Sequence, residues 1–228
     1  MNAQLMDKII AFLNPKRHKG EQSYIGDILT EYKNKRPNYE DFRVAAHKAL
    51  EALLEEEGYK YQIVSRTKTP ERLEEKLLRK KREGILYHSV EEVEDLVGIR
   101  IIFYTERDKD RFTKRIKNEI GGFMKVEERN KQNGYRATHI VMSFGPKRLK
   151  LSEYKHLRGL KSEIQLTSIL HHAWAEIEHD LIYKDINNLK DQDPEKFELM
   201  KEKINQLQEK YIKKAAAELE DIIEKSST

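Results

Sequence analysis

Residues 162–180, with the sequence SEIQLTSILHHAWAEIEHD, contain the pattern of a short strand followed at once by a helix. In the first part, Ile164 and Leu166 alternate with polar residues, which predicts a strand with one face on a core. Glu163 and Gln165 then project from the opposite face, where a carboxylate and an amide can line a cleft. We therefore expect a functional cleft on the polar side of this strand.

The second part of the stretch has the spacing of an amphipathic helix. Thr167 or Ser168 is expected to cap its N-terminus, because a hydroxyl there can accept from backbone N–H groups of the first turn. The apolar residues that follow lie three and four positions apart, at Ile169, Leu170, Ala173, Trp174, Ile177 and Leu181. The stretch is therefore predicted to be a strand-to-helix junction.

The composition is that of a folded and densely charged protein. The chain has 228 residues, with 37% charged and 38% hydrophobic residues and a mean hydropathy of −0.84. Its length and its periodic apolar positions predict one core, 59–185, with a helical segment before it, 1–58, and a C-terminal helix after it, 193–226. The net charge of +4 is a mild bias toward anionic ligands.

The absence of cysteine excludes disulfides and thiolate metal sites, and a reducing cytoplasm agrees with it. The apolar run 9–13 is too short for a membrane span, so we expect a cytoplasmic protein without a membrane partner. Residues 1–13 are predicted to form a short helix, which the basic turn 14–20 ends. That turn is either a solvated loop or a contact for phosphate or RNA.

Periodicity along the chain predicts an α+β fold, with a mixed sheet of about five strands flanked by helices. Two N-terminal helices, 23–35 and 38–57, are expected on either side of Pro37. Further helices are predicted at 70–82, 89–96 and 107–120, and further strands at 59–66, 97–104, 123–128 and 135–144. The continuous apolar run of 97–104 indicates a central strand.

Residues 59–82 form the most basic window of the chain, with nine Lys or Arg against three Glu. Within it, Arg72, Lys76 and Lys80 recur every four residues, so they share one face of the predicted helix. A row of cations beside a strand end suits a polyphosphate, because its charge needs several donors at once. A helix face that is merely solvated is the alternative.

Two carboxylates and three cations lie in or beside the predicted strands. Asp95 and Glu163 can share one divalent cation, since Mg²⁺ is usually held by a few hard oxygen ligands together with phosphate oxygens. Arg66, Lys68 and Arg100 would then neutralise a triphosphate. Arg100 lies within an apolar strand, so it must face a cleft, a ligand or the carboxylate of a structural salt bridge.

The predicted strand 135–144 adds an aromatic residue and a histidine on one side, Tyr135 and His139. Tyr135 offers a flat face on which a base can stack, worth about 1–3 kcal/mol. Lys131, Arg136 and His139 would hold the phosphates of an acceptor. The pattern as a whole indicates a metal-assisted transfer of a phosphate-rich group on a mixed sheet.

Four sequence motifs follow one another over about 120 residues. They are R-x-K-T-P-x-x-L-x-x-K-L at 66–77, E-D-L-V-G-I-R at 94–100, K-x-N-G-Y-R-x-x-H at 131–139, and E-I-Q followed by H-A-W-A-E-I-E-H at 163–179. Together they resemble the RelA/SpoT alarmone synthetase domain, and the chain is similar to the small, synthetase-only members of that family.

This resemblance implies an ATP-dependent pyrophosphotransferase of the GTP diphosphokinase type on a nucleotidyltransferase-like sheet. It would move the β,γ-pyrophosphate of ATP to the ribose 3′-hydroxyl of GDP or GTP, with Mg²⁺, to make (p)ppGpp, the alarmone of the stringent response. The implied ATP-binding residues are Arg66, Lys68, Lys76 and Arg100. The implied catalytic residues are Asp95, a metal ligand, and Glu163, a second metal ligand or the base. The implied acceptor-binding residues are Lys131, Asn133, Tyr135, Arg136, His139, Gln165 and His172.

The acceptor side departs from the family pattern, because Thr167 and Ser168 replace an arginine-threonine pair. Some small members of the family are toxins that pyrophosphorylate the 3′ CCA end of tRNA and block translation. A tRNA acceptor, with an antitoxin protein as partner, is therefore the alternative interpretation. A basic surface for tRNA would come from Lys16, Arg17, Lys19, Lys155 and Arg158. A catalytically inactive nucleotide- or RNA-binding module is the third interpretation.

The apolar residues of the C-terminal helix are spaced like the a/d seam of a coiled coil. They lie at Phe197, Met200, Ile204, Leu207 and Tyr211, and Ala215, Leu219 and Ile222 continue the seam. This seam either packs on the body of the same chain or forms the contact between copies in a homo-oligomer.

Overall fold

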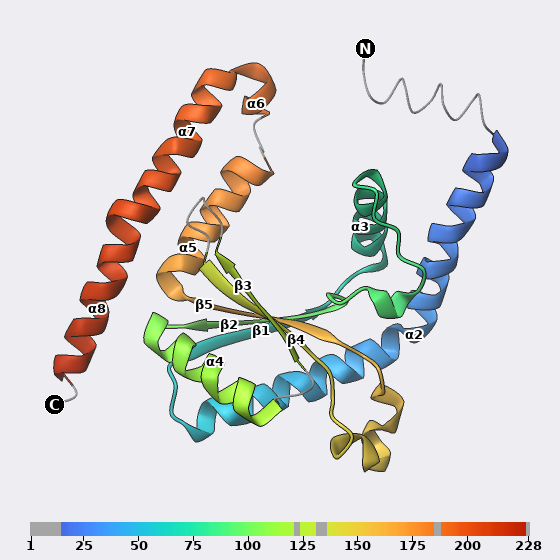
Figure 1. Ribbon diagram of the computed structural model, residues 1–228, viewed down its shortest axis with the longest axis horizontal. Coiled ribbons are helices and arrows are strands. Elements are labelled where there is room, and N and C mark those ends of the chain that lie inside the picture. The colour runs from blue at the N-terminus through green and yellow to red at the C-terminus, as the bar shows by residue number, and fades with distance from the viewer. Residues whose placement is uncertain (1–14, 121–123, 131–135, 185–187, 227–228) are drawn as a thin grey trace.

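Five strands form a mixed sheet at the centre of the protein, whose computed structural model describes residues 15–120, 124–130, 136–184 and 188–226 (Figure 1). The strands are β1 (Tyr61–Thr67), β2 (Val97–Phe103), β3 (Met124–Asn130), β4 (Arg136–Met142) and β5 (Ser162–Ser168). They lie in the order β1-β2-β5-β4-β3, with β2 and β5 parallel and the other neighbours antiparallel. The predicted α+β fold with a five-stranded mixed sheet is confirmed.

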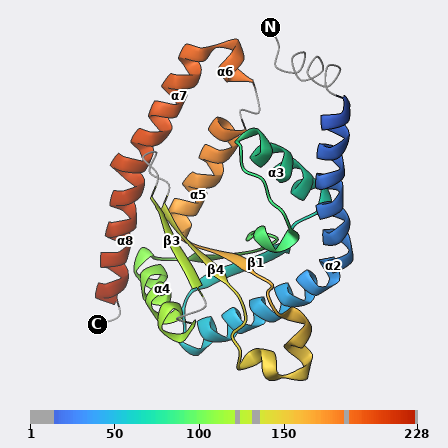
Figure 2. The same ribbon diagram turned by 45° about the vertical axis from the view of Figure 1, so that its right-hand side comes forward.

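Helices lie on both sides of this sheet. The long ones are α2 (Pro15–Glu56), α3 (Pro70–Arg82), α4 (Glu106–Ile120), α5 (Ile169–Glu178), α7 (Pro194–Leu207) and α8 (Lys213–Ser226). Shorter elements are α6 (Leu189–Gln192), 3-10 turns at Val90–Glu92, Arg148–Lys150 and Ser152–Leu157, and π turns at His179–Tyr183 and Gln208–Ile212. Figures 1 and 2 show α2 and α4 across one face, and α3 and α5 rising on the other.

The core lies between the sheet and the two helices α2 and α4. Phe42 and Leu50 of α2 and Phe112 of α4 are fully buried there, together with Ile99 of β2 and Ile164 of β5. These side chains come from alternate positions of each strand, so the intervening positions face the opposite side of the sheet. That opposite side is the polar one.

Helix α2 corrects two predictions for the N-terminal part of the chain. It runs without a break from Pro15 to Glu56, so the basic turn predicted at 14–20 is wrong from residue 15 onward, and so is the break predicted at Pro37. Proline inside a helix removes one hydrogen bond. Here the helix buries Tyr32, Tyr39 and Phe42 around that point, and this packing offsets the lost bond. The helix predicted at 1–13 lies outside the described residues.

The element between α3 and β2 is also shorter than predicted. Helix α3 begins where its sequence indicates, with Thr69 accepting from the N–H of Arg72 at 3.3 Å and Pro70 in the first turn. The helix predicted at 89–96, in contrast, is only the single turn Val90–Glu92. Val93 and Leu96 are buried beyond that turn, so they anchor a second, non-helical turn that leads Asp95 to the start of β2.

The C-terminal helix packs on the body of the chain with its first half. Phe197 and Ile204 are buried, and the indole N–H of Trp174 on α5 donates to the carbonyl of Ile204 at 3.0 Å. Gln208 is fully buried as well, whereas Leu207 and Tyr211 are 50% and 64% exposed. The packed face follows the predicted seam at Phe197, half-buried Met200 and Ile204, which bears out the intramolecular alternative there, and then shifts to Gln208.

Within the described part of the chain, none of the helices is both long enough and apolar enough to cross a bilayer.

Candidate active site

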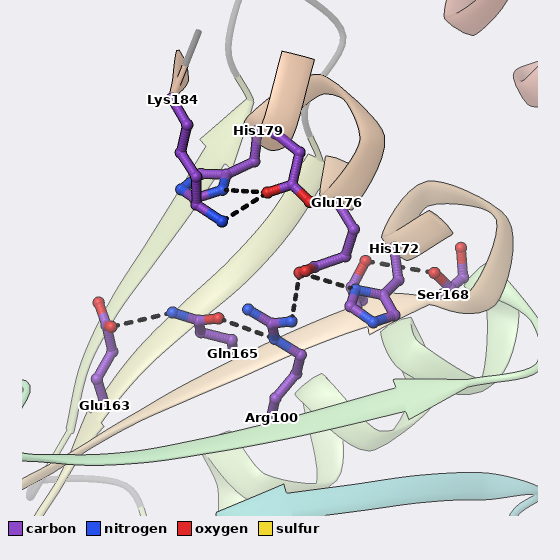
Figure 3. Close-up of polar contacts among 10 residues, drawn as sticks. Arg100, Glu163, Gln165, Ser168, His172, Glu176, His179 and Lys184 are labelled. Atoms are coloured by element: carbon purple, nitrogen blue, oxygen red, sulfur yellow. Dashed lines mark hydrogen bonds and ion pairs between the residues drawn. The ribbon is translucent and has the colours of Figure 1, made fainter. Parts of the chain in front are cut away.

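A chain of polar contacts crosses the open face of the sheet from β4 to α5, and Figure 3 shows its part from Glu163 to His172. His139 Nδ1 lies 2.9 Å from Glu163 Oε1, and Gln165 Nε2 donates to Glu163 Oε2 at 3.1 Å. Arg100 Nε donates to Gln165 Oε1 at 3.2 Å, and Arg100 Nη1 reaches Glu176 Oε1 at 2.6 Å. The candidate catalytic carboxylate and the candidate ATP-binding guanidinium thus belong to one network.

Strand register explains why these side chains meet. Gln165 is paired with Arg100 on one side and with His139 on the other, so the three lie in one row across β2, β5 and β4. In the neighbouring row, Glu163 is paired with Gly98. Because side chains of paired residues project to the same face, the polar residues at alternate positions of three strands gather on one surface.

Arg66 reaches the same surface from the edge strand β1, where it is paired with Gly98. A Cβ added at Gly98 would lie 4.0 Å from Arg66 Cγ, so the arginine side chain extends over this glycine. Between Arg66 on β1 and Glu163 on β5, the central position therefore carries no side chain. The missing side chain at Gly98 leaves room for a charged ligand beside Arg66, Arg100 and Glu163.

Asp95 forms a second cluster at the start of β2. Its carboxylate lies 2.6 Å from Lys76 Nζ of α3 and 3.3 Å from Lys68 Nζ, which follows β1. The backbone N–H of Lys68 donates to the carbonyl of Leu96 at 2.8 Å, which holds the two segments together. Two predicted ATP-binding cations are therefore the ion-pair partners of a predicted metal ligand, a pairing that the sequence motifs did not indicate.

The two predicted metal ligands, Asp95 and Glu163, lie at the same end of two neighbouring inner strands of the sheet. Because β2 and β5 are parallel, Asp95 just before β2 and Glu163 near the start of β5 come from corresponding ends of the two strands. Both carboxylates already have cationic or amide partners. In the described ranges, no three His, Asp or Glu side chains gather as a preformed metal site. The donor set fits a cation that is completed by ligand oxygens rather than a closed protein cage.

The acceptor side is described only in part. Lys131, Asn133 and Tyr135 lie outside the described residues, and Arg136 is placed only as the first residue of β4. His139 is 5% exposed, and the structure places it against Glu163. Its predicted contact with an acceptor stays a prediction.

The junction after β5 has the predicted strand-to-helix form. Ser168 is the N-cap of α5, but its hydroxyl lies 3.4 Å from His171 Nδ1 and caps no backbone amide. Thr167, at the position of the family's arginine, is buried, and its hydroxyl donates to the Ser168 carbonyl at 3.4 Å. The junction therefore brings no cation to the open face at that position.

His172 lies on the first turn of α5, close to Glu176. Its Nδ1 is 3.7 Å from Glu176 Oε1. Burial and then the positive charge of Arg100 lower the pKa of His172, and Glu176 opposes them. The imidazole is therefore mainly neutral near pH 7, and it contributes hydrogen-bonding nitrogens rather than a positive charge.

Glu176 is the site residue that the sequence analysis missed. It sits in the H-A-W-A-E-I-E-H motif, one helical turn after His172, and the i, i+4 spacing was the signal for a shared face. Its partner Arg100 is 76 residues away in the chain, and helix periodicity carries no information about such a contact.

The fold and the surface together define an α+β protein with a mixed sheet, whose polar face combines arginine and lysine side chains with the carboxylates of Asp95, Glu163 and Glu176. Residues 65–188 match the family described as "Region found in RelA / SpoT proteins". This stretch is more than half of the chain, and the chain therefore belongs to the RelA/SpoT family.

Two relatives come from Bacillus subtilis (strain 168). GTP pyrophosphokinase YwaC is 32% identical over 128 residues, and GTP pyrophosphokinase YjbM is 30% identical over 128 residues. Each match covers 54% of this chain, and it spans 58% of YwaC and 56% of YjbM, less than two thirds of either. The crystal structure of small alarmone synthetase 1 from Bacillus subtilis has the same fold, with a TM-score of 0.65 and 20% identity over 86% of this chain and 98% of that one.

Proposed function

We propose that the protein is an ATP-dependent pyrophosphokinase that transfers the β,γ-pyrophosphate of ATP to the ribose 3′-hydroxyl of GDP or GTP, forming (p)ppGpp. The observation that carries the proposal is Glu163, held by His139 and Gln165 on the same sheet face as Arg66 and Arg100. Membership of the RelA/SpoT family and the names of the two relatives support the same activity.

On the donor side, the cations of the open face neutralise the triphosphate. Arg66 and Arg100 act as forked donors to phosphate oxygens, and Lys68 and Lys76 add point charges from the Asp95 cluster. Asp95 would hold Mg²⁺, which supplies charge neutralisation for the phosphates when it is bound. Positioning and charge stabilisation are expected to dominate, as in other phosphoryl transfers.

Glu163 serves as the base on the acceptor. The acceptor's 3′-oxygen attacks the β-phosphorus of ATP, the bond from that phosphorus to the α-phosphate oxygen breaks, and AMP leaves. The 3′-hydroxyl proton passes to a carboxylate oxygen of Glu163. His139 and Gln165 each hold one of its oxygens, so the carboxylate keeps one orientation on the sheet.

The acceptor is placed by residues on the other side of Glu163. We assign this role to Gln165, His139 and His172, whose side chains line the open face from β5, β4 and α5. Lys131, Asn133, Tyr135 and Arg136 complete the acceptor side by resemblance to the family motif, with Tyr135 stacking on the base.

The test is transfer of label from γ-³²P-ATP in the presence of Mg²⁺ with GDP, GTP or bulk tRNA offered separately. We expect the label on the guanine nucleotides, with one AMP released for each label transferred. Label only on tRNA would replace the proposal by the tRNA-modifying alternative. Label on none of the three acceptors would favour the inactive binding module.

A further inference from the structure

Glu176 forms a contact that the proposed transfer does not use. It lies on α5 with 54% of its side chain exposed, and its carboxylate contacts Nη1 of Arg100 at 2.6 Å (Figure 3). Arg100 comes from the adjacent strand β2, with 33% of its side chain exposed. The same carboxylate is 3.7 Å from His172 on its own helix. One acidic side chain thus stands between a donor-side cation and an acceptor-side histidine.

The orientation of Arg100 does not depend on Glu176. Arg100 Nε donates to the amide oxygen of Gln165, the residue paired with it on β5. The amide nitrogen of Gln165 donates in turn to Glu163. The plane of the guanidinium is therefore set from the sheet, by a hydrogen bond between neighbouring strands, and removing Glu176 leaves this support in place.

Glu176 holds Nη1 of Arg100, one of the guanidinium nitrogens through which arginine can bind phosphate. Arginine binds phosphate and carboxylate through the same terminal N–H groups, so the two anions compete for them. A polyphosphate that engages Nη1 of Arg100 has to displace the carboxylate. Once displaced, Glu176 keeps a neighbour, because His172 lies one helical turn before it.

We propose that Glu176 is an internal competitor of the donor triphosphate at Arg100 and thereby a residue that sets the affinity for ATP. This rests on the proposed function, in which Arg100 binds ATP. Glu176 acts through Arg100 and is a positioning residue, without contact to the reacting atoms. Its removal should tighten donor binding.

The experiment is calorimetric binding of α,β-methylene-ATP, in which the bond broken during transfer is blocked, in Mg²⁺ buffer without acceptor. Glu176→Gln should bind this analogue about three to five times more tightly than the wild-type chain, as expected for release of an exposed ion pair. In turnover, KM for ATP should fall by a similar factor, while kcat stays within twofold.

Two controls make the result specific. Asp180→Asn removes the same charge one turn further along the chain, where Asp180 pairs with Lys184 at 2.6 Å, and it should leave the affinity unchanged. In a chain that already carries Arg100→Gln, adding Glu176→Gln should leave the affinity for α,β-methylene-ATP unchanged, because the carboxylate and the triphosphate compete for Arg100.

The outcomes that would overturn the role of Glu176 differ from the one that would overturn the proposed function. An unchanged or weaker affinity of Glu176→Gln overturns the inference, and so does tightening that persists without Arg100 or appears equally in Asp180→Asn. In each of these cases the labelled-transfer assay still shows whether the wild-type chain is a pyrophosphokinase. A wild-type chain that neither binds the analogue nor transfers label overturns the proposed function and this inference with it.

Discussion

At the scale of single residues, function depends on which partner each charged group has. Glu163 is 16% exposed and has partners on both sides, His139 and Gln165, so it is fixed in direction but still accessible. Asp95 is held by two lysines, whose charges a bound phosphate group can share. In the proposed function, the phosphates of the ligand would replace these carboxylates at the cations.

Substituting Glu163 tests the base. Glu163→Gln should lower kcat by about 10²–10⁴-fold, because the amide keeps the shape but cannot take the 3′-hydroxyl proton. The thermal midpoint should change little, since the side chain is not part of the apolar core. Glu202→Gln, an exposed change on α7, serves as the matched control. Activity of Glu163→Gln within tenfold of wild type would contradict the assignment.

His172 provides a prediction about pH. Its folded pKa lies below the ordinary value of 6.5, first through burial and then through Arg100. The unfolded chain therefore binds more protons than the folded one as the pH falls below 6.5, and the stability from neutral His172 is present above that pH and lost toward the folded pKa.

The measurement is urea unfolding from pH 7.5 down to pH 5 for the wild-type chain and for His172→Asn. We expect the wild-type free energy of unfolding to fall more steeply with decreasing pH than that of the variant. Equal slopes, or an NMR titration of His172 above 6.5, would show that the pKa is not lowered.

At the scale of secondary-structure elements, α5 and α7 act as a pair. Helix α5 carries Glu176 and His172 toward the open face, and it presents Trp174 to α7 on another side. Figures 1 and 2 both show the C-terminal helix running beside α5. The first half of the C-terminal helix therefore supports the element that carries part of the site.

Phe197 and Leu199 are two apolar residues on α7 that allow this support to be measured. Phe197 is 5% exposed and Leu199 is 52% exposed. Phe197→Ala should lower the free energy of unfolding by about 3–5 kcal/mol, whereas Leu199→Ala should change it by less than about 0.5 kcal/mol. The fluorescence of Trp174, the single tryptophan of the chain, follows the unfolding. Equal losses for both variants would contradict the packing.

At the scale of the whole molecule, the sheet order brings together residues that are far apart in sequence. Strand β5 lies between β2 and β4, so the motif that contains Glu163 is flanked by those that contain Arg100 and His139. Helix α3 and α5 stand on the same side of the sheet, at the two ends of the polar face (Figure 1). The proposed donor-binding and acceptor-binding residues thus come from opposite ends of one surface.

The outer side of the C-terminal helix remains exposed in the single chain, with Tyr211 and Ile222 at 64% and 60%. A double variant, Tyr211→Lys with Ile222→Lys, should keep the thermal midpoint within about 2 °C, since neither side chain is buried. Light scattering of the same variant then decides the oligomer alternative. A smaller mass than that of the wild-type chain would locate a homo-oligomer contact here, and a clear loss of stability would contradict the exposure.

The sequence by itself determined most of the strands and helices around the sheet and the places of the motifs. The alternation around Glu163, the junction at Ser168 and the start of α3 at Pro70 are local patterns, which neighbouring residues set. Periodicity of two or of 3.6 residues reports such patterns directly. The mixed sheet and the polar face of β5 were predictable for that reason.

Only the tertiary structure decided which charges meet. The pairing of Lys76 with Asp95 and of Glu176 with Arg100 depends on strand order and register. The same holds for the continuity of α2 through Pro37 and for the burial of Gln208 in place of Leu207. In each case packing or ion pairing between distant segments decides the outcome, and the identity of a distant partner leaves no periodic signal in the chain.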